Sequence, residues 1–172
     1  AKGGLMTASD NLREAIHLAW EEAGVILGND GNYIWKRNNA LDTVNLSGIS
    51  ITTAEKESLN LCLEAILQTK GILIETVPLT SLGKSALEIL NEQTEKGGLD
   101  LTGCSLRQVL YFVQTNRAVL GKLRGEYVLI VGYDPYNAVI LDPLTNETYR
   151  IGLSDGTIAF EESGNEFIVL NE

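Results

Sequence analysis

The sequence has 172 residues, of which 44% are hydrophobic and 21% are charged. These values are typical of a water-soluble globular domain, and no apolar run approaches the roughly 18 residues that a membrane span requires. Thirteen Lys and Arg residues against 23 Asp and Glu residues give a formal charge of −10, which would repel a phosphate backbone. Composition therefore argues against membrane insertion of this domain and against nucleic acid as a partner.

We expect residues 1–172 to form a single domain. The first ten residues, AKGGLMTASD, contain neither an initiator Met nor the features of a signal peptide, so we interpret the chain as a domain excised from a longer protein. The two cysteines, Cys62 and Cys104, lack the close spacing of a metal site. We expect two free thiols, no metal and no cofactor.

The first hundred residues predict helices. Apolar residues recur at intervals of three and four over 10–24, 53–71 and 80–98, and each of these segments ends at a glycine. Between them, residues 25–50 are rich in Asn, Asp and Gly and predict a loop with one short strand or helical turn, and residues 72–77 predict a short strand.

The pattern changes after residue 100. A capped helix is predicted over 105–116, followed by β-rich runs separated by Gly, Pro, Asn and Asp, which predict an antiparallel meander over 118–151. The run EYVLIVGYD at 126–134 is apolar nearly throughout, as expected of a central strand covered on both faces. A short helix and a last strand are predicted over 154–170. Helices followed by a sheet predict an α+β fold.

The segment GEYVLIVGYDPYNAVILDP at 125–143, with the helix SLRQVLYFVQTN before it, resembles the bacteriocin-processing peptidases and their stand-alone relatives. These are papain-like enzymes that cleave double-glycine leaders and are found on certain ABC exporters. The resemblance covers residues 105–143 by motif and the first hundred residues by the order of elements. It implies a papain-like cysteine peptidase fold, with N-terminal helices packed on a C-terminal antiparallel sheet.

The resemblance also implies a catalytic triad, and here it is incomplete. Asp142 matches the acid that orients the catalytic histidine, Glu126 stands in the place of that histidine, and the place of the nucleophilic cysteine falls at Thr7, Ala8 or Ser9. A carboxylate is a much weaker base than imidazole at neutral pH and cannot hold the proton of a thiol. We therefore expect a degenerate member of the family, with no catalytic residues and no hydrolysis.

Cys104 offers an alternative. It precedes a predicted helix, as does the nucleophile of the circularly permuted relatives, so the chain would be an active cysteine hydrolase if His17, the one histidine of the sequence, came close to it. The plainer interpretation is that Gly103 or Ser105 caps the helix and Cys104 packs in the core. His17 itself is expected to be partly buried and hydrogen-bonded, because one histidine alone is a poor metal site.

The expected function is that of a non-catalytic, peptidase-like domain in a larger protein of the bacterial envelope or a secreted protein. Its partner would be a peptide or protein segment, bound by Ser9, Glu126, Tyr127 and Asp142, since some exporters of large toxins carry such a domain without the cysteine. Two alternatives stay open. In the first, Glu126 and Asp142 share a cation. In the second, Glu126 is a solvated residue and Asp142 is a turn acid, and the domain acts as a spacer.

Overall fold

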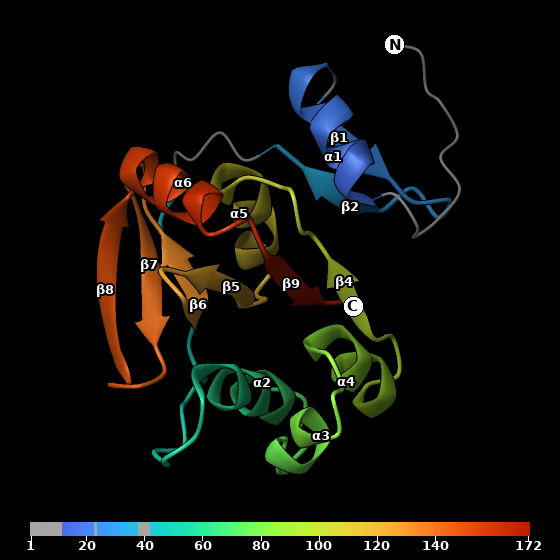
Figure 1. Ribbon diagram of the computed structural model, residues 1–172. Helices are drawn as coiled ribbons and strands as arrows, with labels where there is room; N and C mark the ends of the chain where they lie inside the picture. Colours follow the sequence, from blue (N-terminus) through green and yellow to red (C-terminus); the bar gives the residue numbers. More distant parts are fainter. Residues whose placement is uncertain (1–11, 23, 38–41) are drawn as a thin grey trace.

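The computed structural model describes residues 12–22, 24–37 and 42–172, and its centre is an antiparallel sheet (Figure 1). Within these ranges the strands of this sheet are β3 (Val44–Asn45), β4 (Gly98–Asp100), β5 (Val119–Leu123), β6 (Glu126–Tyr133), β7 (Asn137–Asp142), β8 (Glu147–Gly152) and β9 (Phe167–Leu170). They run in the order β4-β9-β5-β6-β7-β8, and β3 pairs with β6. The predicted meander is confirmed as β5 to β8, each paired with the next.

Strand β6 is the central strand that its sequence predicts. Its residues are buried from Val128 to Tyr133. Val128 and Ile130 belong to one apolar cluster, and Leu129 and Val131 belong to another. Because neighbouring side chains of a strand point to opposite faces, the sheet carries a core on each face.

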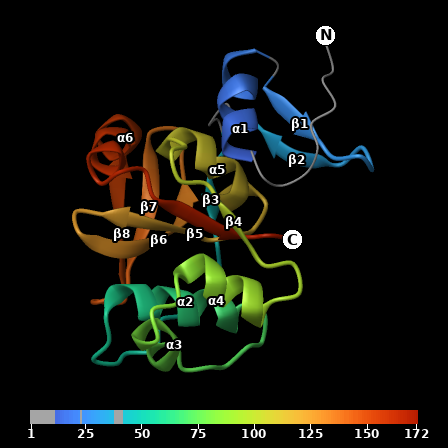
Figure 2. The same cartoon turned by 45° about the vertical axis from the view of Figure 1, so that its right-hand side comes forward.

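Helices cover both faces of the sheet (Figure 2). On one face lie α5 (Leu106–Gln114) and α6 (Leu153–Glu162), and on the other lie α2 (Ser58–Gln68), α3 (Val77–Ser81) and α4 (Ala86–Gln93). The expected α+β arrangement of helices packed on an antiparallel sheet is confirmed. No helix in the described ranges is long and apolar enough to cross a membrane.

The N-terminal part packs on α5 rather than on the sheet. It consists of α1 (Leu12–Glu21) and a hairpin of β1 (Val25–Leu27) and β2 (Tyr33–Lys36), where the sequence predicted one short element in a loop. Trp35 of β2 is fully buried, and its Nε1–H donates to the carbonyl oxygen of Gln108 in α5 at 2.8 Å. Burial of this indole fixes the hairpin to α5.

Helix α2 begins later than predicted. The segment before it stays extended, with Glu57 at φ −61° and ψ 148°, and the helix starts at Ser58 instead of after Thr53. The Lys56 ammonium holds this segment, because it lies 2.9 Å from the Glu64 carboxylate and 2.8 Å from that of Glu75. These contacts between side chains outweigh the local helical pattern of residues 54–57.

The predicted strand at 72–77 is absent from the described sheet, and that prediction was wrong. Thr76 is fully buried, donates its hydroxyl to Asn60 Oδ1 at 2.9 Å, and donates its N–H to a carboxylate oxygen of Glu64 at 2.9 Å. A residue whose backbone N–H is bonded to a helix side chain cannot also serve a strand ladder.

The predicted helix over 80–98 is divided into α3 and α4. Gly83 lies between them at φ +84°, a conformation that suits glycine and ends a helix. Helix α4 then begins with a capping box formed by Ser85 and Glu88. Residues 98–100, for which the sequence predicted no strand, form β4 and pair with β9.

Candidate functional site

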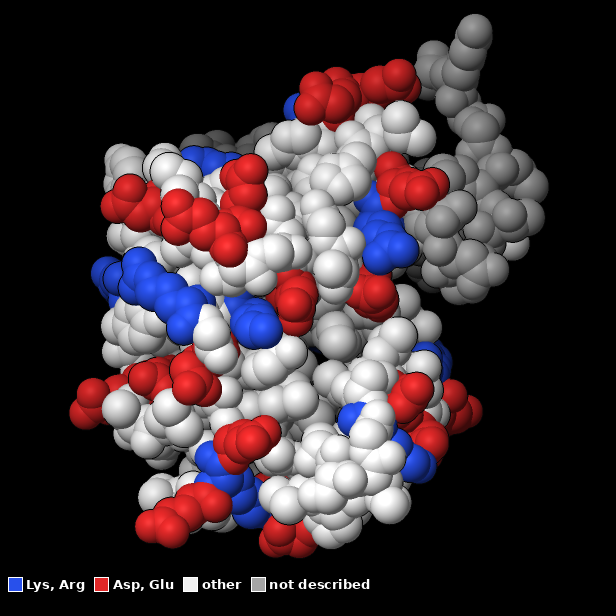
Figure 3. Space-filling model, in the orientation of Figure 1, with Lys and Arg blue, Asp and Glu red and all other residues white. Residues whose placement is uncertain are grey.

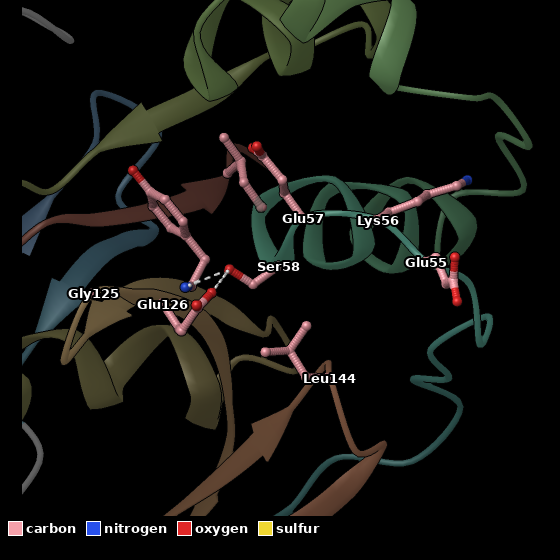
Figure 4. A pocket seen from close by; sticks show the side chains of 9 residues that line it. Glu55, Lys56, Glu57, Ser58, Gly125, Glu126 and Leu144 are labelled. Atoms are coloured by element: carbon pink, nitrogen blue, oxygen red, sulfur yellow. Dashed lines mark hydrogen bonds between the residues drawn. The ribbon is translucent and has the colours of Figure 1, made fainter.

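A pocket of about 650 Å³ lies where the start of α2 meets the start of β6 (Figure 4). Its walls are the extended segment and first turn at 55–59, the turn and strand start at 125–127, and Leu144 from the connection between β7 and β8. These three segments are far apart in sequence. The pocket therefore exists only because α2 packs across the sheet.

Ser58 joins the two sides of this pocket. Its Oγ–H donates to Glu126 Oε2 at 2.6 Å, and its Oγ accepts the N–H of Tyr127 at 2.9 Å. Ser58 is only 4% exposed, although its acceptor Glu126 is exposed, so both bonds are partly buried. The hydroxyl thus connects the first turn of α2 to the first two residues of β6.

Local structure places both partners. A two-residue turn joins β5 to β6, with Arg124 at φ 52° and Gly125 at φ 86°, and it pairs Leu123 with Glu126. Such a turn fixes the register of the hairpin and so sets Glu126 at the strand start. The N-cap residue of α2, Glu57, makes no side-chain cap bond, so the positive end of this helix faces the pocket.

The structure brings together some of the predicted site residues. Glu126 and Tyr127 line the pocket, whereas Ser9, like Thr7 and Ala8, lies outside the described residues. The helix that meets Glu126 is α2, not the helix that was predicted over 10–24. Ser58, which sequence reasoning missed, therefore stands at the start of α2 opposite Glu126.

Asp142 serves the turn that follows β7. Its Oδ1 accepts the N–H of Leu144 at 2.9 Å, and its carbonyl oxygen accepts the N–H of Asn146 at 2.9 Å. No hydrogen bond joins it to Glu126, and the described part of the chain contains no group of three or more His, Cys, Asp or Glu that could hold a metal ion. A cation shared by these two carboxylates and backbone oxygens stays a prediction.

The two thiols are buried in the core. Burial raises the pKa of the Cys104 thiol to about 12, and burial, followed by the negative charge of Asp142, raises the pKa of Cys62. Both residues are 0% exposed. A thiol in such surroundings stays protonated at neutral pH and is neither a nucleophile nor a metal ligand.

Histidine does not come to the pocket. His17 is exposed rather than partly buried, and its Nδ1 lies 3.3 Å from Nε2 of Gln108 in α5, across the sheet from α2. Ser105 caps α5, and its hydroxyl oxygen accepts the N–H of Gln108. Together with the burial of Cys104, these contacts argue against the alternative cysteine hydrolase.

Comparison with known proteins supports the fold. No family model and no curated protein matches the sequence. The crystal structure of a "putative C39-like peptidase" from Bacillus anthracis superposes with a TM-score of 0.64 at 15% sequence identity, over 76% of this chain and 98% of that chain. At this identity the likeness shows the fold alone, and it agrees with the papain-like α+β fold expected from the sequence.

Proposed function

We propose that this domain binds an extended segment of a peptide or protein at the pocket between α2 and β6 without hydrolysing it. It would act as a peptidase-like interaction module of a larger protein of the bacterial envelope or a secreted protein. The observation that carries the proposal is the hydrogen bond between Ser58 and Glu126, the residue that the resemblance matches to the catalytic histidine of a cysteine peptidase.

This pair is poorly suited to acyl transfer. A serine hydroxyl needs a general base that is strong enough at the working pH, and a carboxylate is a weak one. The Ser58 oxygen also accepts the Tyr127 N–H, which withdraws electron density from the atom that would attack. The described lining of the pocket contains neither Cys nor His.

The same pocket is well suited to binding. Its volume of about 650 Å³ lies within the roughly 300–1,000 Å³ of typical ligand sites. Leu59, Tyr127 and Leu144 supply apolar wall, and Glu126 supplies a fixed acceptor. Apolar surface with a few oriented polar groups is the usual composition of a site that recognises side chains of an extended peptide.

The test is binding of the wild-type domain to an array of short extended peptides, with mass spectrometry of each bound peptide to detect cleavage. We expect binding without cleavage, and we expect Glu126→Ala to weaken it while the circular dichroism spectrum stays unchanged. The matched control is Glu162→Ala, an exposed carboxylate at the end of α6, which should bind like the wild type. Absence of binding to every peptide, or cleavage of any, would overturn the proposal.

A further inference from the structure

The charges that line the pocket are unbalanced. Glu55, Glu57 and Glu126 are exposed carboxylates in its wall, and none of the three has an ion-pair partner among the described residues. Figure 4 shows Glu126 directed at Ser58, whereas the Glu57 side chain extends from the helix start away from both. One oxygen of Glu126 accepts the serine hydroxyl, which leaves the other free to accept from a ligand.

The one lysine in the pocket wall does not neutralise these carboxylates. Lys56 donates to Glu64 at 2.9 and 3.1 Å and to Glu75 at 2.8 Å, and its side chain is only 16% exposed. Its three N–H donors are thus directed at carboxylates outside the pocket lining. The ion pairs turn this cation away from Glu57 and Glu126, so the pocket keeps its negative charge.

The rest of the lining fits a long side chain with a charged end. Leu144 is 54% exposed and Leu59 is partly buried, so both present apolar surface to the pocket. Lysine and arginine place their methylene stems on apolar surface and their charged ends among polar groups. An acidic side chain would face Glu55, Glu57 and Glu126, and a purely apolar one would leave these carboxylates unpaired.

The net charge of the chain acts in the same direction. Figure 3 shows patches of Asp and Glu alternating with patches of Lys and Arg on one face of the molecule. The chain carries a formal charge of −10. A field of this sign raises the rate at which cationic segments meet the domain.

We infer that the pocket selects a lysine or arginine side chain within the bound segment, with Glu57 and Glu126 as the carboxylates that contact the cation. This inference rests on the proposed function and adds the chemical class of the ligand. It assigns specificity to two exposed residues of the pocket wall, of which Glu126 also accepts the Ser58 hydroxyl.

The experiment is an NMR titration of the ¹⁵N-labelled domain with pools of N-acetylated, C-amidated peptides in which one position is fixed. The fixed residue is Lys, Arg, norleucine or Glu, and one further norleucine pool keeps a free amino terminus, to separate a cationic side chain from a cationic chain end. The Tyr127 amide reports on the site, because it donates to Ser58. One variant is Glu57→Gln with Glu126→Gln, which keeps the size and the hydrogen-bonding capacity of both side chains. The control is Glu162→Gln, which removes one exposed carboxylate outside the pocket lining.

We expect the Lys and Arg pools to bind about 5- to 10-fold more tightly than acetylated norleucine, as two partly exposed ion pairs would give. The preference should vanish in Glu57→Gln/Glu126→Gln, persist in Glu162→Gln, and shrink at about 1 M salt, where the Debye length is about 3 Å. Equal binding of all pools, a preference only for the free amino terminus, or a preference that survives the double variant would overturn this inference and leave the proposed function standing. If no pool shifts the Tyr127 amide, the proposed function falls with it.

Discussion

Helices α2 and α5 each have a serine at their start, and the two serines are used differently. At α5, Ser105 forms a capping box with Gln108, three residues away, so the helix start is satisfied within its own first turn. At α2, Ser58 donates to Glu126 and accepts from Tyr127, residues 68 and 69 positions further along the chain.

This difference distinguishes a helix start with a structural role, that of α5, from one that forms part of the candidate binding site, that of α2. The start of α5 is closed, because Cys104 beside it is fully buried and Ser105 and Gln108 each bond to the other's backbone N–H. The start of α2 has no side-chain cap and lines the pocket. The Ser58 hydroxyl bonds to the sheet and not to its own helix. At the start of α2 a helix hydroxyl bonds to a distant strand instead of to its own helix. We therefore look for function there.

The largest expected effect concerns the closed start. Native Cys104 should react with iodoacetamide at least about 100-fold more slowly than in the unfolded chain, because reaction requires opening of the core. Since burial raises its pKa to about 12, the thiol stays protonated through neutral pH, and its reaction rate should keep rising with pH instead of levelling off near the ordinary thiol pKa of about 8.5. If the Cys104 thiol titrated below about pH 8.5 in the native protein, the start of α5 would be a reactive site. It would then no longer be the purely structural helix start described above.

The next largest effect tests the open start. In Ser58→Cys with Glu126→His, the new thiol sits at a helix N-terminus beside an imidazole, and both lower its pKa. We expect alkylation at pH 7 about 10-fold faster than in Ser58→Cys alone, measured by mass spectrometry. Ser105→Cys, which has no such partner, is the matched control at α5. Equal rates in the single and double variants would mean that Ser58 does not occupy the nucleophile's place.

A smaller effect compares the two serines in stability. Ser58→Ala leaves the Tyr127 N–H and the Glu126 carboxylate without their shared partner, and we expect a cost of about 1–3 kcal/mol in the free energy of unfolding. Ser105→Ala removes a cap and should cost about 1 kcal/mol. Urea titrations of both variants measure the difference. A Ser58→Ala cost below that of Ser105→Ala would show that the bond between the layers contributes little.

The smallest effect is the pH dependence of the segment before α2. Burial alone would raise the pKa of Glu64, but hydrogen bonds from Thr76 and Lys56 lower it. Because the pKa of Glu64 is lower in the folded protein than in the unfolded chain, the ionised carboxylate stabilises the fold at pH values above the unfolded pKa of about 4.3. This stabilisation is lost as the pH falls through the folded pKa. Glu64→Gln should therefore flatten the acid limb of the urea midpoint plotted against pH. Glu92→Gln, at a more exposed ion pair with Lys84, should change the limb less.

Much of the fold followed from local signals in the sequence. The meander of β5 to β8, the cap of α5 at Ser105 and the central position of β6 were predictable, because turn residues and apolar alternation act over a few positions. The start of α2 was not, because Lys56 is held by Glu64 and Glu75 rather than by its neighbours. Thr76 was misjudged for the same reason, since its partners lie in α2.

Part of the candidate site could be predicted from the sequence. Glu126 and Tyr127 follow a two-residue turn that the sequence shows, and the resemblance drew attention to Glu126. Ser58 could be found only once the packing of α2 on the sheet was known. The available signal was a serine directly before the apolar run LNLCLEAIL, but several serines and threonines of the chain precede such runs.

The position of β6 between two cores has a consequence for the lifetime of the site. Strands buried on both faces exchange their amide hydrogens last, while edge strands and peripheral hairpins open first. Glu126 and Tyr127 begin the central strand, and β8 at the edge is largely exposed. The sheet half of the pocket is thus anchored to the slowest-opening part of the molecule. Strand β8, or the hairpin of β1 and β2, can unfold locally while β6 holds Glu126 in place.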